Sequence, residues 1–348
     1  MLQAGGKRGR CGGSIPHAGG LPLKESHKAV KCFWRGLIDM KTETHQFPPP
    51  PRPRWYTHSY DGPVLYRLVA GCAPLLPRVL RFGCAKALAG LYRRRMPQEY
   101  AAAQRNIARI LPEADPTTIR QVAQSLFRHF AYYFADLLSL NRQSLPVQQR
   151  YVHRIHNFDR LQPILESRQG FVAATAHLGN WDLAGRLLSP FGKTVHVVMA
   201  PEQHTAVQRL LREENRPPSL RFISNDDTGG FVQLLMALRR GDVVAVQVDR
   251  GTGHRSDIAV NFFGKPVFLP GGPFVLARAA RVPVIPFFCL MRPDHHYEIH
   301  IGEAISVERG GEEEALHQMV RVLEHYIAMA PDQWFNFYDV WDNSTATR

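Results

Sequence analysis

Short apolar runs alternate with amphipathic stretches from residue 158 onward. The apolar runs are typical of buried strands, and they lie at 171–176, 194–200, 220–224, 243–248, 284–290 and 297–301. The stretches with helical periodicity lie at 158–168, 181–189, 203–214, 229–240, 273–281 and 312–330. Strands that alternate with helices predict an α/β fold, a three-layer sandwich whose central sheet is largely parallel and flanked by helices. The last two apolar runs are joined by a short segment, so they predict an antiparallel hairpin at one edge.

The pattern is different upstream of residue 158. Residues 98–111 and 117–140 have apolar positions at helical spacing and predict two amphipathic helices. Residues 62–91 are apolar but interrupted by basic residues, and no uncharged apolar run reaches the roughly 18 residues of a simple membrane span. Two interpretations of this segment stay open: a helix lying in the plane of an anionic membrane, or a buried helix with exposed arginines.

Residues 1–61 predict a basic, proline-rich leader. Ten basic residues face three acidic ones within residues 1–56, and residues 48–53 read PPPPRP, which fits neither a helix nor a central strand. Residues 1–39 are interpreted either as a disordered tail or as sequence upstream of a true start at Met40. We therefore expect a leader over 1–61, a helical membrane-contacting segment over 62–157, and an α/β core over 158–348 packed with that segment as one unit.

Charge and cysteine usage narrow the classes of function. The 348 residues carry a net charge of +13, and about half of that excess lies in the leader. The remaining chain is moderately basic, which favours an anionic membrane surface or an acidic substrate over a nucleic acid. The five cysteines form no CxxC pair, so we expect a reducing compartment, no disulfide framework and no metal site.

The stretch FVAATAHLGNWD, residues 171–182, carries the candidate chemistry. It reads as a buried strand that ends at His177, a Gly-Asn turn, and a helix that begins near Trp181. Ligands of open α/β sheets bind beyond the carboxyl ends of the strands. A carboxylate on one imidazole nitrogen raises the basicity of the other, and Asp182 is close enough in sequence to fold back onto His177. The alternative also stays open: a structural histidine, with Asp182 as a helix N-terminal carboxylate.

The motifs of several competing enzyme classes are missing from the sequence. It contains no GxSxG elbow, no Walker A loop, no HExxH, and no GxGxxG after the first of these strands. A histidine base without a protein nucleophile favours direct attack by an acceptor on an activated substrate. The loop at residues 249–255, DRGTGHR, follows another predicted strand and opens onto the same crevice if the sheet is parallel. Arg250 or Arg255 can there hold a phosphate or an oxyanion, unless the loop is merely solvated.

Taken together, these motifs resemble the bacterial lipid A late acyltransferases, the lauroyl/myristoyl acyltransferase family of the glycerolipid acyltransferase superfamily. HLGNWD resembles the H-x4-D/E motif of that superfamily. The resemblance covers about residues 62–342, and its other segments are 99–112, 248–250, 262–266, 269–273 and 331–335. It implies one-step transfer of a fatty acyl chain from a thioester, on acyl carrier protein or coenzyme A, to a lipid hydroxyl, with no further cofactor.

The resemblance also implies roles for individual residues. His177 is the general base and Asp182 orients it. The expected substrate-binding residues are Asn180 and Trp181, which shape the turn, together with Asp249, Arg250, Arg255 and Lys265. The implied acceptor is a lipid such as a lipid A precursor, at the cytoplasmic face of the inner membrane. Two rival functions stay open: an acyl-thioester hydrolase on the same scaffold, and a non-catalytic lipid- or membrane-binding protein.

Overall fold

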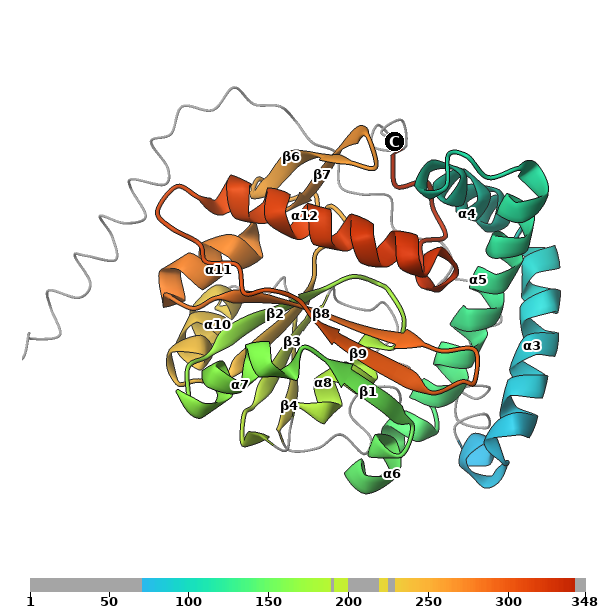
Figure 1. The fold of residues 1–348 in the computed structure, drawn as a ribbon, viewed down its shortest axis with the longest axis horizontal. Helices are drawn as coiled ribbons and strands as arrows, with labels where there is room; N and C mark the ends of the chain where they lie inside the picture. Colours follow the sequence, from blue (N-terminus) through green and yellow to red (C-terminus); the bar gives the residue numbers. More distant parts are fainter. Residues whose placement is uncertain (1–70, 189–190, 200–218, 225–228, 342–348) are drawn as a thin grey trace, which may run out of the picture. The chain divides into compact units, whose positions relative to one another are not determined.

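A seven-stranded sheet forms the centre of the computed structural model, which describes residues 71–188, 191–199, 219–224 and 229–341 (Figure 1). The strand order is β1-β9-β8-β2-β5-β3-β4. The strands are β1 (Val152–His156), β2 (Phe171–Thr175), β3 (Val195–Met199), β4 (Leu220–Ser224), β5 (Val243–Gln247), β8 (Val284–Met291) and β9 (Tyr297–Ile301). Strands β2, β3, β4, β5 and β8 are parallel to one another, and β9 is antiparallel to β8. The predicted fold class is confirmed.

Helices cover both faces of the sheet. One face packs against α10 (Gly230–Arg239), α11 (Gly272–Ala280) and α12 (Glu312–Met329). The other packs against α7 (Phe158–Glu166), α8 (Trp181–Leu187) and parts of α3 and α5. Strand β2 serves both cores, because Val172 and Ala174 belong to the first and Phe171 and Ala173 to the second. A strand buried on both faces explains its continuous apolar run.

Three helices precede the sheet and stand together at the right of Figure 1. They are α3 (Arg78–Arg95), α4 (Pro97–Ile110) and α5 (Pro116–Leu137), followed by the short α6 (Leu145–Gln149). The part of the chain that the structure describes also contains the 3₁₀ turns η2 (Ala73–Leu75), η3 (Leu140–Arg142) and η6 (Pro331–Gln333). Among the helices of the described residues, none is long and apolar enough to cross a membrane.

Two strand pairings in the structure, β1 with β9 and β6 with β7, are not predicted from the sequence. The predicted β8–β9 hairpin is present, but β1 pairs with β9, so β1 forms the edge of the sheet. Its sequence VHRIH has mostly exposed side chains and therefore no apolar run to reveal it. A second, separate hairpin joins β6 (Asp257–Phe262) to β7 (Lys265–Pro270). Its turn places Phe263 and Gly264 at positive φ, and a phenylalanine there is no recognisable turn signal.

Parts of the expected organisation lie outside the described residues. These parts are the leader at 1–61, the start of the helical segment up to residue 70, and the predicted helix at 203–214. The expected domain boundaries, including the choice between the two interpretations of residues 1–39, stay predictions.

Candidate active site

His177 and Asp249 lie beyond the ends of two neighbouring parallel strands. Strands β2 and β5 pair in register from Phe171 with Val243 to Thr175 with Gln247. Two residues further along each chain, the register brings the two side chains together. Nδ1 of His177 lies 2.8 Å from Oδ1 of Asp249, and the backbone N–H of His177 donates to Oδ2 at 3.1 Å. The carboxylate is fully buried, whereas 21% of the His177 side chain is exposed.

The surroundings of Asp249 keep its carboxylate ionised. Trp334 Nε1 donates to Oδ2 at 2.8 Å, and Asn336 Nδ2 donates to the same oxygen at 3.3 Å. Burial by itself would raise the pKa of Asp249. The charge and hydrogen bond of His177, the charge of Arg250 and the hydrogen bond of Trp334 outweigh burial and hold that pKa well below its usual range. An ionised carboxylate only accepts hydrogen bonds, so Nδ1 of His177 carries a proton and Nε2 is the basic nitrogen.

Asp182 occupies a different position from the one expected. Its Oδ2 accepts hydrogen bonds from Asn141 Nδ2 and Arg186 Nε, both at 2.8 Å. Only 3% of the Arg186 side chain is exposed, so Asp182 neutralises a buried guanidinium at the first turn of α8. Among the described residues, the carboxylate that contacts the His177 imidazole belongs to Asp249. The sequence predicts Asp249 as a substrate-binding residue. Its contact with His177 cannot be predicted from the sequence, because it depends on β2 and β5 being neighbours in the sheet.

The turn between His177 and α8 is fixed against the end of β8. Gly179 has a φ of +64°, and a Cβ there would lie 2.0 Å from the carbonyl oxygen of Cys289. The backbone N–H of Asn180 donates to that same oxygen at 2.8 Å. No residue other than glycine fits this approach of the two backbones without displacing one of them.

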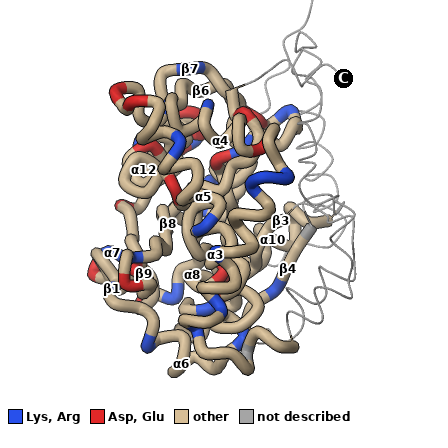
Figure 2. The backbone as a smooth tube through the Cα atoms, turned by 90° about the vertical axis from the view of Figure 1, so that its right-hand side faces the viewer, with Lys and Arg blue, Asp and Glu red and all other residues tan. Residues whose placement is uncertain are grey.

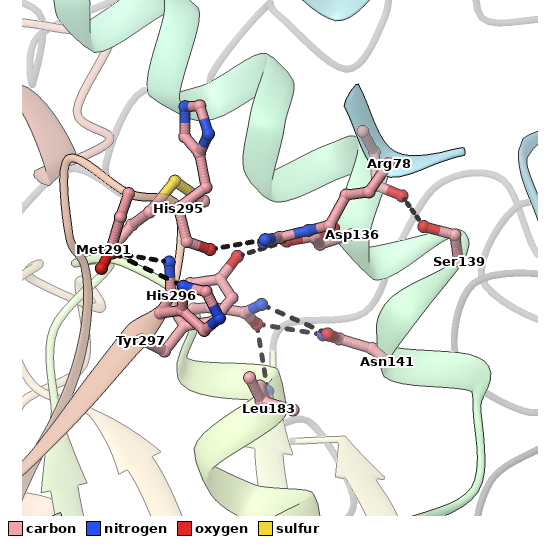
Figure 3. Close-up of polar contacts among 12 residues, drawn as sticks. Arg78, Asp136, Ser139, Asn141, Leu183, Met291, His295, His296 and Tyr297 are labelled. Carbon is pink, nitrogen blue, oxygen red and sulfur yellow. Dashed lines mark hydrogen bonds and ion pairs between the residues drawn. The ribbon is translucent and has the colours of Figure 1, made fainter. Parts of the chain in front are cut away.

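The side chain of Asn180 caps α8 from within the protein. It is 1% exposed, and its Oδ1 accepts from Leu183 N at 3.1 Å and from Asn141 Nδ2 at 3.0 Å. Asn180 Nδ2 donates back to Asn141 Oδ1 at 3.2 Å. Figure 3 shows the hydrogen bonds of Asn141 and Leu183 in this turn. Asn141 thus joins Asn180 to Asp182 by hydrogen bonds. Asn141 and Asn180 together help to fix the shape of the turn.

A buried ion pair lies behind the turn and secures the first turn of α3 (Figure 3). Arg78 donates from Nε and Nη2 to the two carboxylate oxygens of Asp136, at 3.1 and 2.5 Å, and from Nη1 to His295 O at 2.6 Å. The Tyr297 hydroxyl donates to Asp136 Oδ2 at 2.7 Å. Burial, and then the neighbouring Asp136, raises the pKa of Tyr297 well above its usual value, so the phenol stays a donor. No motif in the sequence points to Arg78, Asp136 or Tyr297 as part of the site.

Aromatic side chains border the exposed side of His177. The Trp181 ring lies edge-on to the imidazole, with 5.5 Å between the ring centroids. Tyr133 and Phe335 pack against Trp181 at 4.6 and 6.1 Å. The backbone N–H of Phe335 donates to His177 O at 2.8 Å. The structure therefore brings Trp181 next to the histidine.

The three basic residues expected at the substrate lie in different places. Arg250 Nη2 donates to Phe335 O at 2.7 Å, and its guanidinium lies 5.6 Å from the centroid of the Tyr338 ring. Arg255 is exposed in the loop that follows Asp249, and Asp257 closes this loop by accepting from Thr252 and Gly253. Lys265 is exposed next to the β6–β7 turn.

Comparisons with known proteins agree with the resemblance that the sequence motifs show. Residues 57–343 match a protein family described as bacterial lipid A biosynthesis acyltransferase. Phosphatidylinositol mannoside acyltransferases of two Mycobacterium tuberculosis strains, CDC 1551 and H37Rv, are each 28% identical over 194 residues, 53% of this chain and 60% of the relative. The enzyme of the same name from Mycolicibacterium smegmatis is 25% identical over 199 residues, 55% of this chain and 63% of the relative. The match therefore spans less than two thirds of the length of these curated relatives.

Proposed function

The chain belongs to the bacterial lipid A biosynthesis acyltransferase family, and on that premise we propose that it is a membrane-associated O-acyltransferase that uses His177 as its general base. The donor in this proposal is a fatty acyl thioester, on acyl carrier protein or coenzyme A. The acceptor is a hydroxyl of a lipid such as a lipid A precursor. The relatives named for phosphatidylinositol mannoside extend the candidate acceptors to other glycolipids.

The reaction needs one base and no covalent enzyme intermediate. Nε2 of His177 takes the proton of the acceptor hydroxyl as the oxygen attacks the thioester carbonyl. The tetrahedral intermediate collapses when the carbon–sulfur bond breaks, and the thiolate leaves with the proton returned by His177. Asp249 stabilises the imidazolium that forms in between. Asp249 replaces Asp182 in the orienting role of this proposal.

The observation that carries the proposal is the contact between His177 Nδ1 and the buried, ionised carboxylate of Asp249. A solvated surface histidine needs no such partner, whereas a base that must be held in one tautomer does. Trp181 lies beside the ring, where it can shield the reacting atoms from water. For Arg250 we propose a positioning role: it holds the backbone of Phe335, which in turn bonds to the backbone of His177. We keep Arg255 as a candidate for the donor's phosphate groups and Lys265 as a further substrate-binding candidate.

We place the membrane contact of this proposal on α3. Its buried stripe consists of Phe82, Ala85 and Ala89, and the opposite side exposes large apolar side chains. Those exposed on α3 and just before it are Leu75, Leu76, Val79, Leu80, Leu88, Leu91 and Tyr92. Basic residues accompany them and end in the cluster at 93–95. Figure 2, which faces α3, shows Lys and Arg positions in blue along this side. Such a helix suits insertion into one leaflet with its cations on anionic headgroups.

The test of the catalytic proposal is lipid-dependent acyl transfer. The full chain is incubated with labelled acyl carrier protein or acyl-coenzyme A, with and without bacterial lipid extract. We expect label to move into lipid with the wild-type chain and not with His177→Ala, while His317→Ala, which removes a half-buried histidine of α12, behaves as wild type. Label released as free fatty acid without lipid would establish the hydrolase instead. Turnover that His177→Ala leaves intact with every donor would overturn the proposal.

The test of the membrane proposal is co-sedimentation with vesicles that contain phosphatidylglycerol. The variant Val79→Glu places a charge on a side chain that is 83% exposed on α3. We expect it to weaken vesicle binding. The matched control is Met329→Glu, at the end of α12, where the side chain is 53% exposed. Equal binding by the wild type and both variants would rule out α3 as the contact.

A further inference from the structure

Two histidines and a glutamate gather at the edge of the sheet, on the face that α12 covers. Residues Glu298 and His300 alternate along β9 with Tyr297, Ile299 and Ile301, which point into the core of the other face. His156 ends β1 and pairs with His300 in the parallel register of β1 and β9. The His300 ring packs against Tyr326 of α12.

The three side chains converge on a small volume. His156 Nε2 lies 3.1 Å and His300 Nε2 lies 3.9 Å from Oε2 of Glu298. One ligand atom from each side chain lies within 4.8 Å of the other two. The two imidazole rings are stacked, with centroids 4.4 Å apart and an angle of 3° between their planes. Oε1 of Glu298, the other oxygen, accepts from Arg292 Nη1 at 2.5 Å.

The side chains present ligand types that a divalent metal takes from a protein, two imidazole nitrogens and one carboxylate oxygen. The Glu298 oxygen that faces the two histidines is Oε2, whereas the hydrogen bond from Arg292 goes to Oε1.

We propose that His156, Glu298 and His300 bind one zinc ion at the edge of the sheet. Two imidazoles and one carboxylate are a donor set typical of zinc, and the fourth position is taken by water. Exposed His325 of α12 is near enough to His300 to act on it electrostatically, and it is a second candidate for that position. Because the stacked rings lie in parallel planes, binding requires them to tilt toward the ion.

The proposed ion joins the edge strand to its neighbour. It links β1 to β9 through side chains that are 142 and 144 positions apart in sequence, which is why motif spacing gave no sign of it. Strand β8 lies between β9 and β2, the strand that leads to His177. The ion is therefore placed outside the reacting atoms of the proposed acyl transfer, and its expected effect is on the stability of the edge strand. This inference does not depend on the proposed function.

The test is a titration of the metal-free full chain, made without a histidine tag, with Zn²⁺ in a calorimeter. We expect a site of one ion per chain whose affinity falls by at least about tenfold in His156→Ala and in His300→Ala. The matched control is His153→Ala, which removes an exposed histidine from the same strand, β1, and is expected to keep the site. Zn²⁺ should also raise the melting temperature of the wild type and of the control, and not that of the two site variants.

A second readout excludes a folding artefact. Glu298→Gln keeps the shape of the side chain and removes its charge, and we expect it to weaken Zn²⁺ binding while circular dichroism shows a folded chain. Co²⁺ in the wild-type site should give the strong visible absorption of a tetrahedral complex, lost in Glu298→Gln. The proposal is overturned if all three site variants bind Zn²⁺ as tightly as the wild type, or if the wild type binds none.

Discussion

The carboxylate on Nδ1 of His177 determines which ring nitrogen is available as a base. Two carboxylates lie near the histidine in the fold, and their surroundings differ. Asp249 is buried, bonds to the imidazole and also accepts from Trp334, while Asp182 bonds to Arg186 and Asn141. These contacts support the proposal that Asp249 orients the general base and that Asp182 stabilises α8.

Asp249→Asn and Asp182→Asn are predicted to fail in different ways. An amide at position 249 no longer holds the imidazole in one tautomer, so we expect the rate of acyl transfer to fall about 100-fold or more with the chain still folded. An amide at position 182 leaves the buried Arg186 without its counter-charge, so we expect the free energy of unfolding to fall by about 3–5 kcal/mol. Labelled acyl transfer and urea denaturation measure the two effects. A folded Asp182→Asn that loses as much rate as Asp249→Asn would return the orienting role to Asp182.

Gly179→Ala tests the approach of the catalytic turn to β8. The added methyl group would lie 2.0 Å from Cys289 O, so either the turn or the end of β8 must move. We expect strong destabilisation and loss of acyl transfer. Gly192→Ala is the matched control, because Gly192 also has a positive φ, +68°, but nothing lies within 4 Å of its added Cβ. In the control, the free energy of unfolding should fall only by the strain of placing alanine in a left-handed conformation, about 1–2 kcal/mol. Similar losses in both variants would mean that backbone strain, not the contact with β8, is decisive.

At the scale of the element, a buried ion pair anchors the first turn of α3. Arg78 begins the helix, and its guanidinium reaches the fully buried Asp136 of α5. The same carboxylate accepts from Tyr297 at the start of β9. One carboxylate therefore joins the proposed membrane helix, α5 and the sheet.

Asp136→Asn is predicted to destabilise the chain by about 3–5 kcal/mol, because it leaves Arg78 buried without a counter-charge. Asp339→Asn is the matched control, since the pair of Asp339 with Arg105 is exposed on the arginine side and is expected to contribute about 0–1 kcal/mol. Urea denaturation of both variants measures the difference. Equal losses would show that burial of the Arg78 pair contributes nothing beyond an ordinary surface pair.

At the scale of the whole molecule, hydrophobic periodicity is sufficient to predict the layers of the fold. The five strands that are parallel to one another agree with the predicted apolar runs within one or two residues. Strands β2 and β8 are the clearest cases, because burial on both faces demands a continuous apolar run. Strand β1 was missed because its side chains are mostly exposed, and β6–β7 because its turn uses Phe263 at positive φ.

The candidate site was only partly predictable for a related reason. His177 and its turn lie within one local motif, so the sequence suffices to find them. The pairing of His177 with Asp249 depends on the order of strands in the sheet, and the Arg78–Asp136–Tyr297 cluster joins three distant segments. No local spacing contains that information.

The stability of the metal-free chain should fall as the pH drops from about 6.5 to 4. The pKa of His300 is lowered from 6.5 to about 4 by burial and by His156, so over this range the unfolded chain binds a proton that the folded chain does not. The contribution of neutral His300 to stability is therefore fully present above pH 6.5 and is lost as the pH falls toward 4. The free energy of unfolding falls by up to about 1.4 kcal/mol for each pH unit over this range.

His300→Gln should remove this contribution and flatten the pH dependence of the free energy of unfolding between pH 6.5 and 4. The comparison variant is His317→Gln, which removes a half-buried histidine of α12 and should keep the wild-type slope. Urea denaturation at half-unit pH intervals in the presence of a chelator measures the slopes. An unchanged slope in His300→Gln would mean that His300 already accepts a proton in the folded chain.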